Sequence, residues 1–351
     1  MRYNEVYLDN LSSSPTPDEV IEKMGEYFTK HYGNPICYHQ FGRWSKSAYE
    51  YFQEKVAELL DVRDIDISFT IGFKIPKICD GKILISPFEP PEIFISFEKL
   101  GKKIENIHIA DWEYDLSWLE DKLRNDKISL VVLSSADRVT GTVQPIEQCV
   151  EICHKYGTSV LVNFSTFIGR RKFSISNIGT NFGYIQGRVF GAPCDLILGE
   201  KIDKSFPHQL AGGFVKSLEL LYENLDSHIS KLDELSQYFW EMIQLHLPHL
   251  KLLGGDEKIA GNFAIAFEDV QRQALMLALD MQGVMVWAGD NLYEPIESLL
   301  KSGVPKEIEE STVRFSLWRQ TTQEDLDYVL RVLPPLVDRV RYEMGSPKFK
   351  K

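Results

Sequence analysis

Residues 128–163 read ISLVVLSSADRVTGTVQPIEQCVEICHKYGTSVLVN, and this segment is the clearest guide to the fold. Its two ends, 128-ISLVVL and 158-TSVLVN, are short apolar runs rich in β-branched residues, which is typical of buried strands. Between them, 145-PIEQCVEICHKYG has the length and the apolar spacing of a helix. A strand, a helix and a second strand in this order predict a crossover unit on a mainly parallel sheet.

The same alternation of strands and helices extends outward from this unit, over residues 17–210. After residue 215 the pattern changes to a long helical segment, 216–247, which predicts one helix or two in succession. We therefore predict a large α/β domain over residues 1–245, which includes the N-terminal segment and the long connecting helix. A small α+β domain is predicted over residues 246–351.

The composition is that of an ordinary globular protein, with 44% hydrophobic residues, 26% charged residues and a net charge of −12. The longest apolar runs have only the length of a strand, and the N-terminus lacks the apolar stretch of a signal peptide, so we expect a cytoplasmic protein. The negative charge argues against binding to nucleic acid or to anionic membranes, which both require a basic face. The basic cluster Arg170-Arg171-Lys172 is predicted to be a solvated surface turn.

The five cysteines form no zinc-type pattern of paired CxxC units. Cys149 and Cys153 lie four residues apart on a predicted helix, and therefore on one face of it. We interpret them as buried core thiols and expect no metal site.

Six segments carry recognisable motifs: 6-VYLDN, 33-GNPICYHQFGR, 140-TGTVQPI, 261-GNFAIAFEDV, 272-RQALMLALDMQGV and 312-TVRFSLWRQTTQEDLDYVL. Together they resemble the cysteine desulfurases of the class V aminotransferase family, and the resemblance covers nearly the whole chain. It implies the α/β fold of fold-type I transferases that use pyridoxal phosphate, with a large mainly parallel sheet domain and a small C-terminal α+β domain. It also implies a dimer, for which we interpret His39 as an architectural residue.

The residues that handle the cofactor in that family differ at the matching positions of this sequence. The Schiff-base lysine corresponds to Arg188, which cannot lose its proton to form an imine. The histidine before that lysine corresponds to Gly187. The carboxylate that contacts the pyridine nitrogen corresponds to Asn163, and the glutamine near it to Thr166. The stacking histidine corresponds to Pro90.

Two further segments depart from the family pattern. The family's phosphate-binding loop corresponds to 71-IGFKI, which has no hydroxyl group. The family's nucleophilic cysteine lies on a loop that corresponds to 284-VMVWAGDNLYEPIESLL, which contains no cysteine, so no persulfide can form there. From these substitutions we expect no bound cofactor and no catalytic residue.

Large aromatic residues occupy positions where the family carries small residues near its cofactor: Phe73, Phe164, Trp287 and Trp318. Because empty cavities are costly in a protein interior, we predict that some of these side chains fill the vacated pocket. The alternative is that each belongs to ordinary core or surface.

Arg314 matches the family arginine that clamps the substrate carboxylate, a role suited to a bidentate guanidinium. The alternative role of Arg314 is a structural ion pair within the small domain. A pocket that retained both Arg314 and Arg188 would be positive and suited to a small anion or carboxylate.

Two hypotheses follow from the resemblance and the substitutions. The first is a non-catalytic, desulfurase-like scaffold or regulator that forms a homodimer or a heteromer with an active desulfurase. The second is an active, pyridoxal phosphate-dependent cysteine desulfurase or transaminase. Such an enzyme would hold its cofactor without a covalent bond or through a lysine at another position, such as Lys201 or Lys204.

Overall fold

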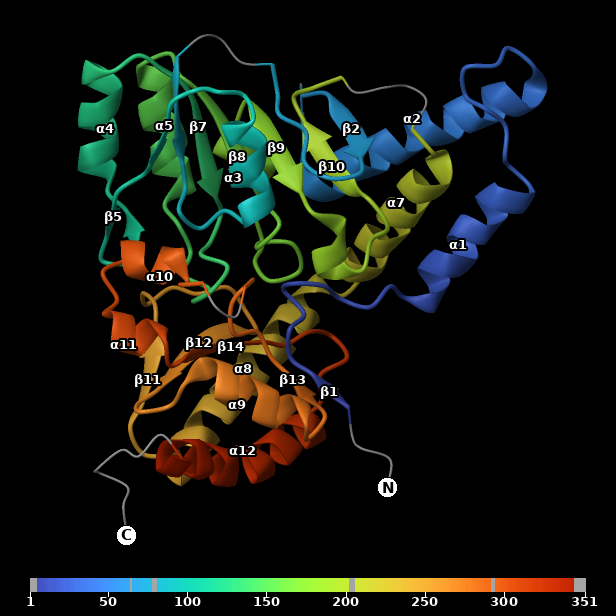
Figure 1. Cartoon of the computed structure of the whole chain (residues 1–351). Helices are drawn as coiled ribbons and strands as arrows, with labels where there is room; N and C mark the ends of the chain where they lie inside the picture. Colours follow the sequence, from blue (N-terminus) through green and yellow to red (C-terminus); the bar gives the residue numbers. More distant parts are fainter. Residues whose placement is uncertain (1–4, 64, 78–80, 202–205, 292–293, 344–351) are drawn as a thin grey trace.

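The computed structural model describes residues 5–63, 65–77, 81–201, 206–291 and 294–343. Figure 1 shows an upper part built on a large sheet and a lower part built on a smaller sheet. The first described residues, from residue 5, and the last, up to residue 343, both lie in the lower part of the molecule.

The large sheet consists of β2 (Ile67–Thr70), β3 (Lys82–Ile85), β4 (Ile104–Asn106), β7 (Ile128–Ser134), β8 (Ser159–Asn163), β9 (Phe182–Ile185) and β10 (Asp195–Leu198). Around it lie α1 (Asp18–Thr29), α2 (Gln40–Leu60), α3 (Pro91–Glu98), α4 (Leu116–Asn125), α5 (Ile146–Lys155), α6 (Ile175–Ile178), the 3-10 helix η1 (Gly187–Phe190), α7 (His208–Tyr222) and a hairpin of β5 (Ile109–Ala110) and β6 (Glu113–Tyr114). The strand order is β2-β10-β9-β8-β7-β3-β4. All neighbours from β9 to β4 pair in parallel, whereas β10 pairs antiparallel with both β9 and β2.

Both faces of the large sheet are buried, because successive side chains of a strand point to opposite faces. Ile83, Leu130 and Leu161 of the central strands pack against Ile93 and Phe97 of α3 on one face. The alternate residues of the same strands join the larger core, to which α2, α4, α5 and α7 contribute. This two-sided burial explains why the strands are continuous apolar runs in the sequence.

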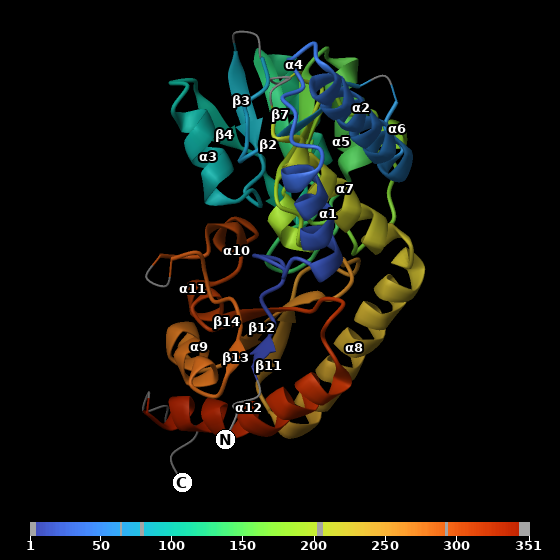
Figure 2. The same ribbon diagram turned by 90° about the vertical axis from the view of Figure 1, so that its right-hand side faces the viewer.

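The smaller sheet is antiparallel, with the order β11-β12-β14. Its elements and neighbours are β11 (Leu250–Leu253), β12 (Asn262–Phe267), β13 (Val284–Met285), β14 (Thr312–Ser316), α8 (Leu225–His246), α9 (Arg272–Asp280), α10 (Glu297–Lys301), α11 (Lys306–Glu309) and α12 (Gln323–Glu343). Figure 2 shows α8 descending along one edge of this part toward α12. No helix among the described residues is long and apolar enough to cross a membrane.

The N-terminal segment packs on the lower part before the chain enters the upper part. Val6 of β1 (Val6–Tyr7) pairs in parallel with Val284 of β13. Asn10 Nδ2 then donates a hydrogen bond to the carbonyl oxygen of Ser316, at 2.9 Å. The predicted domain boundary between residues 245 and 246 stays a prediction. The structure places both β1 and α8, which precede that boundary in the sequence, beside C-terminal elements.

The predicted fold class is confirmed: a mainly parallel sheet is followed by a small α+β unit. The helical segment 216–247 is two helices, α7 and α8, because the chain turns at Glu223 and Asn224. The prediction of a solvated turn is wrong for Arg170, which is only 2% exposed. Its guanidinium donates to the carbonyl oxygens of Ala260 and Leu317, both at 2.8 Å. These bonds tie the upper part to the lower part.

Candidate functional site

The carboxyl ends of three neighbouring strands bring polar residues together, as parallel sheets do at their binding edge. Asn163 ends β8, Ser134 ends β7, and Glu89 follows β3 just before α3. Asn163 Nδ2 donates to Glu89 Oε2 at 2.7 Å, and Ser134 Oγ donates to Glu89 Oε1 at 2.8 Å. Asn163 Oδ1 accepts from the backbone N and from Oγ of Ser165, at 3.1 and 2.6 Å. These four residues are called the Glu89 network below.

The Glu89 carboxylate is the one ionisable group of this network, and it is 4% exposed. Burial raises its pKa to about 7, although the hydrogen bonds from Asn163 and Ser134 oppose the shift. Both donors are neutral, so an ionised Glu89 lacks a contacting cation. Sequence reasoning missed this residue; the available signal was one acidic residue within the apolar turn 85-ISPFEPP, between a strand and a helix.

Arg188, which the resemblance aligns with the family's lysine, lies in η1 directly after β9. Its guanidinium donates to Glu92 Oε1 at 2.9 Å, and the two side chains are 55% and 43% exposed. Gly187 before it has no room for a side chain, because a Cβ there would lie 1.8 Å from the carbonyl oxygen of Cys194. Arg188 therefore forms an exposed ion pair beside a tightly packed turn.

A residual cavity of about 30 Å³ remains at this edge of the sheet, and four of the predicted positions line it: Pro90, Asn163, Thr166 and Arg188. This volume holds little more than one water molecule. Thr166 Oγ1 lies 2.7 Å from Ser135 Oγ and is held there by that hydrogen bond. Among the described residues, no lysine lines the cavity.

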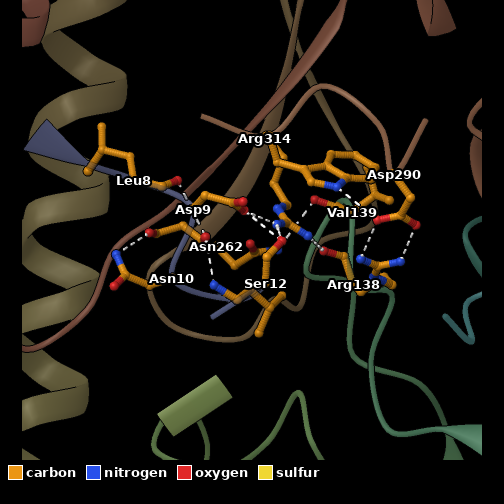
Figure 3. A network of polar contacts seen from close by, with 12 residues as sticks. Leu8, Asp9, Asn10, Ser12, Arg138, Val139, Asn262, Asp290 and Arg314 are labelled. Atoms are coloured by element: carbon orange, nitrogen blue, oxygen red, sulfur yellow. Dashed lines mark hydrogen bonds and ion pairs between the residues drawn. The ribbon is translucent and has the colours of Figure 1, made fainter. Parts of the chain in front are cut away.

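Arg314 is fully buried on β14 and forms an ion pair with Asp9 of the N-terminal segment. Its Nη2 also lies 2.8 Å from Ser12 Oγ, and its Nη1 donates to the carbonyl oxygen of Arg138 at 3.2 Å. Figure 3 shows the Arg314 side chain pointing toward Asp9 and Ser12 rather than toward open space. Both donor nitrogens of the guanidinium fork are thus used within the protein.

A second ion pair lies beside the first. Arg138 donates to both carboxylate oxygens of Asp290, at 2.6 and 2.9 Å (Figure 3). The indole of Trp287 donates to Asp290 Oδ1 at 3.1 Å, and the guanidinium of Arg314 lies 4.6 Å from the centre of a Trp287 ring. Asp9, Arg138, Trp287, Asp290 and Arg314 are called the Arg314 network below.

The structure does not bring the two arginines of the predicted anion site together. Arg188 lines the small cavity, whereas Arg314 is absent from its lining and is enclosed by the Arg314 network. The geometry around Arg314 corresponds to the second role considered above, a structural ion pair.

The four aromatic residues lie in different surroundings, and none of them lines the 30 Å³ cavity. Phe73 packs against Tyr184 on the α3 face of the large sheet, and Phe164 stacks on Phe173 on the other face. Trp318 is covered by Arg170, whose guanidinium lies 4.9 Å from a ring centre. Trp287 lies nearest to the site, through its contacts in the Arg314 network.

Cys149 and Cys153 have the buried surroundings that the sequence predicts. Cys149 and Cys153 are fully buried on α5, and burial raises the pKa of both thiols. Within the described part of the chain, no group of three or more His, Cys, Asp or Glu residues is placed to hold a metal ion.

A large, mainly parallel sheet with a polar carboxyl edge, joined to a small α+β unit, is consistent with the fold-type I class of transferases. The chain belongs to the class V aminotransferase family, because the family's sequence model, "Aminotransferase class-V", matches residues 6–73, 80–194 and 205–329. Among the relatives is a cysteine desulfurase IscS of Dictyoglomus turgidum, which is 27% identical and covers 96% of this chain and 95% of its own. Cysteine desulfurase IscS 1 of Archaeoglobus fulgidus is also 27% identical, over 98% of this chain and 100% of its own.

Solved structures share the fold. The NifS-like protein of Rickettsia africae superimposes with a TM-score of 0.84 at 20% identity, over 95% of this chain and 100% of its own. The apo cysteine desulfurase of Thermococcus onnurineus gives a TM-score of 0.77 at 19% identity, over 95% of each chain. These likenesses establish the fold of the chain.

Family membership corrects the expectation of no cofactor, which is wrong. The class V family model matches most of the chain, and relatives of nearly full coverage are cysteine desulfurases, so pyridoxal phosphate is the cofactor that membership implies. The expectation failed because it treated lost side chains at single positions as decisive against the match of the whole chain.

The residues present do not fit the covalent attachment that the family uses. An imine needs a neutral amine, and the residue at the aligned position is the guanidinium of Arg188, already paired with Glu92. The amide of Asn163 is engaged as well, because its Nδ2 donates to Glu89 and its Oδ1 accepts from Ser165. The volume of about 30 Å³ leaves no space for a pyridine ring in this conformation.

Proposed function

We propose that this chain is a non-catalytic, cysteine desulfurase-like member of the class V aminotransferase family, acting as a dimeric scaffold or regulator in the cytoplasm. The observation that carries the proposal is Arg188 on η1, an exposed guanidinium paired with Glu92 where the resemblance requires an imine-forming lysine. A guanidinium stays protonated at every accessible pH and is not a nucleophile.

The surroundings of Arg188 support the proposal further. The aligned carboxylate position holds Asn163, a neutral amide, so the electrostatic partner of a pyridinium nitrogen is missing there. The loop between β13 and α10 contains no cysteine in the sequence, and desulfuration requires a thiolate nucleophile.

A surface on α1, on α2 and on the segment between them supports the dimeric part of the proposal. Its exposed aromatic residues are Phe28, Tyr32, Tyr38, Phe41 and Trp44, whose exposed fractions range from 37% to 94%. Apolar side chains gathered in this way are typical of interaction surfaces. The partner is a second copy of the chain or, in the heteromeric version, an active desulfurase.

The experiment that tests the proposal is a borohydride trap. The purified protein is incubated with pyridoxal phosphate, reduced with borohydride, digested and searched by mass spectrometry for phosphopyridoxyl-lysine, while sulfide release from cysteine is measured in parallel. We expect no specific lysine adduct and no sulfide above the buffer rate. The Arg188→Lys variant is the matched control, because it restores an amine at the position where the adduct belongs.

A specific adduct on a native lysine, or sulfide release, would overturn the proposal in favour of a second candidate, an active desulfurase or transaminase. The names of the relatives favour that candidate, since both are cysteine desulfurases. Lys201 is 80% exposed and lies 3.5 Å from a carboxylate oxygen of Asp66. Lys204 lies outside the described residues.

A further inference from the structure

A larger cleft lies beside the small cavity, between α3 of the upper part and the segment that leads into α10 of the lower part. Its volume is about 460 Å³, within the range of small-molecule sites. The two spaces share only Phe88 and Arg138 in their linings. The lining residues come from α3 in the upper part and from residues 287–301 in the lower part, so the cleft lies between the two sheet units. Figures 1 and 2 both show α3 at a higher level than α10.

Both walls of the cleft carry apolar side chains. Phe88 and Phe94 line it from the upper part, and Trp287 and Ile296 line it from the lower part. Such walls favour the apolar portion of a ligand, and aromatic rings also attract organic cations through their negative faces.

The charges of the cleft are predominantly negative. Asp290 is neutralised by the bidentate pair with Arg138, and Glu297 lies 3.9 Å from Lys301. The remaining charged residues of the lining are Glu89, Glu98 and Glu294. Glu98 and Glu294 are exposed, and neither carboxylate forms an ion pair with a described residue. A cleft with uncompensated charge of one sign attracts ligands of the opposite sign.

The lower wall of the cleft is held in place by buried and partly buried contacts, so this side of the cleft is pre-formed. Arg272 Nη2 donates to the carbonyl oxygen of Glu294 at 2.6 Å. The backbone N of Ile296 donates to Glu309 Oε1 at 2.8 Å, and Glu309 pairs with Arg272 in the core. A pre-formed wall lowers the ordering cost of binding.

We propose that this cleft binds a small organic cation, whose apolar portion packs between Phe94 and Trp287 and whose positive charge lies near the carboxylates of Glu98 and Glu294. The ligand class is an ammonium compound with an aromatic or short aliphatic substituent. The site goes beyond the proposed function, because Phe94, Glu98 and Glu294 are not among the positions aligned above with the family's cofactor contacts. Trp287 and Glu294 belong to the segment that corresponds to the family's nucleophile loop.

The test is calorimetric titration of the full-length protein with benzyltrimethylammonium, compared with benzyl alcohol and benzoate. A quaternary ammonium cannot form an imine, so the result is independent of whether a lysine binds pyridoxal phosphate. We expect the cation to bind at least threefold more tightly than the neutral alcohol, and benzoate not to bind. Raising the salt concentration weakens binding of the cation, because exposed charges are screened.

The charge contribution is tested with the double variant Glu98→Gln/Glu294→Gln. An exposed charge pair contributes up to about 1 kcal/mol, which is about fivefold in affinity. The double variant should therefore bind the cation about threefold to twentyfold more weakly. Glu151→Gln is the matched control, because Glu151 is an exposed carboxylate on α5 that lies outside the cleft.

The apolar wall is tested separately with Phe94→Ala, which should weaken binding of the cation while leaving its salt dependence in place. Equal binding of the three compounds, preferential binding of benzoate, absence of binding, or unchanged affinity in the double variant would each overturn the proposal. Circular dichroism confirms that each variant is folded before it is titrated.

Discussion

The Glu89 network and the Arg314 network both lie between the two sheet units, yet they satisfy their charges in opposite ways. In the Arg314 network, the cations Arg138 and Arg314 each contact an anion, Asp290 and Asp9 respectively. In the Glu89 network, the single carboxylate accepts hydrogen bonds only from the neutral groups of Asn163 and Ser134. The charged groups of the first region are paired with each other, whereas the buried carboxylate of the second forms no ion pair with a described residue.

The difference shows that a retained residue does not imply a retained role. Arg314 matches the family's substrate clamp in sequence, but its fork is occupied by Asp9, Ser12 and a backbone carbonyl. Its contacts join β14, the N-terminal segment and the turn after β7, which are distant in the sequence. The Arg314 network therefore connects parts of the fold, whereas the Glu89 network lies at the edge where parallel sheets bind ligands.

The largest expected effect is on the Arg314 network. Arg314→Met should reduce the free energy of unfolding by about 3–5 kcal/mol, because it leaves the Asp9 carboxylate without its cation. Urea unfolding followed by circular dichroism measures the change. The double variant Asp9→Asn/Arg314→Met should recover much of the loss, since it removes both charges.

Arg339→Met is the matched control for Arg314. Arg339 pairs with Glu343 on the surface of α12, with 71% of its side chain exposed, so its replacement should cost much less stability than that of Arg314. A loss for Arg314→Met as small as that for Arg339→Met would contradict a structural role of Arg314 and remove the contrast between the two networks.

The next largest effect is the pH dependence of the free energy of unfolding, which we expect from the Glu89 network. Glu89 has a pKa of about 7 in the folded protein against an ordinary value of 4.5, because it is buried. The folded state therefore binds this proton more tightly than the unfolded state does. The resulting contribution of Glu89 to the free energy of unfolding is fully present below pH 4.5 and is lost as the pH rises to about 7. The shift corresponds to at most about 3 kcal/mol.

Glu89→Gln should abolish this pH-dependent contribution to the free energy of unfolding. Unfolding free energies of the native protein and of Glu89→Gln are compared at several values between pH 4.5 and 8, and the difference should move in favour of the variant as the pH rises. Glu151→Gln should follow the native profile throughout. A difference that does not change with pH would show that Glu89 titrates normally in the folded protein.

A buried base should show the opposite dependence. His228 on α8 packs edge-on against Trp318, and burial together with the nearby Arg170 lowers its pKa from 6.5 to about 4. The unfolded state holds this proton more tightly, so stability should fall by about 1–2 kcal/mol as the pH drops from 6.5 to 4.

His228→Leu should remove this acid sensitivity, as measured by thermal unfolding at pH values from 4 to 7. His246, which is largely exposed near the end of α8, provides the control variant His246→Leu, which should retain the acid sensitivity. If the native protein and His228→Leu lost stability in parallel as the pH fell toward 4, that result would contradict a neutral, buried His228.

The fold could be predicted from local patterns in the sequence, whereas the positions at the sheet edge were assigned through the family resemblance. Apolar runs such as 128-ISLVVL identify buried strands, and residues that follow parallel strands converge at one edge. Pro90, Asn163, Thr166 and Arg188 accordingly line one cavity.

Long-range pairing could not be predicted in the same way. The partner of Arg314 is Asp9, 305 residues away in the sequence, and nothing local distinguishes that pair from a ligand site. Arg170 looked like part of a basic surface turn because its acceptors are backbone carbonyls, which carry no side-chain signature. Glu89 was missed for a related reason, since its burial depends on Ser134 and Asn163 of other strands.

The smallest expected effect concerns Arg188, which gives the sharpest contrast with Arg314. Arg188 and Glu92 are both about half exposed, so solvent screens their attraction and the pair should contribute only about 0.2–1 kcal/mol. Arg188→Ala and Glu92→Gln, alone and combined, form a double-mutant cycle that isolates this coupling by urea unfolding. A coupling energy above about 2 kcal/mol would show that Arg188 supports the fold as Arg314 does. A small coupling energy would mean that stability alone does not account for an arginine at this position. The explanation would then lie in the guanidinium group that Arg188 exposes to solvent at the edge of the cavity.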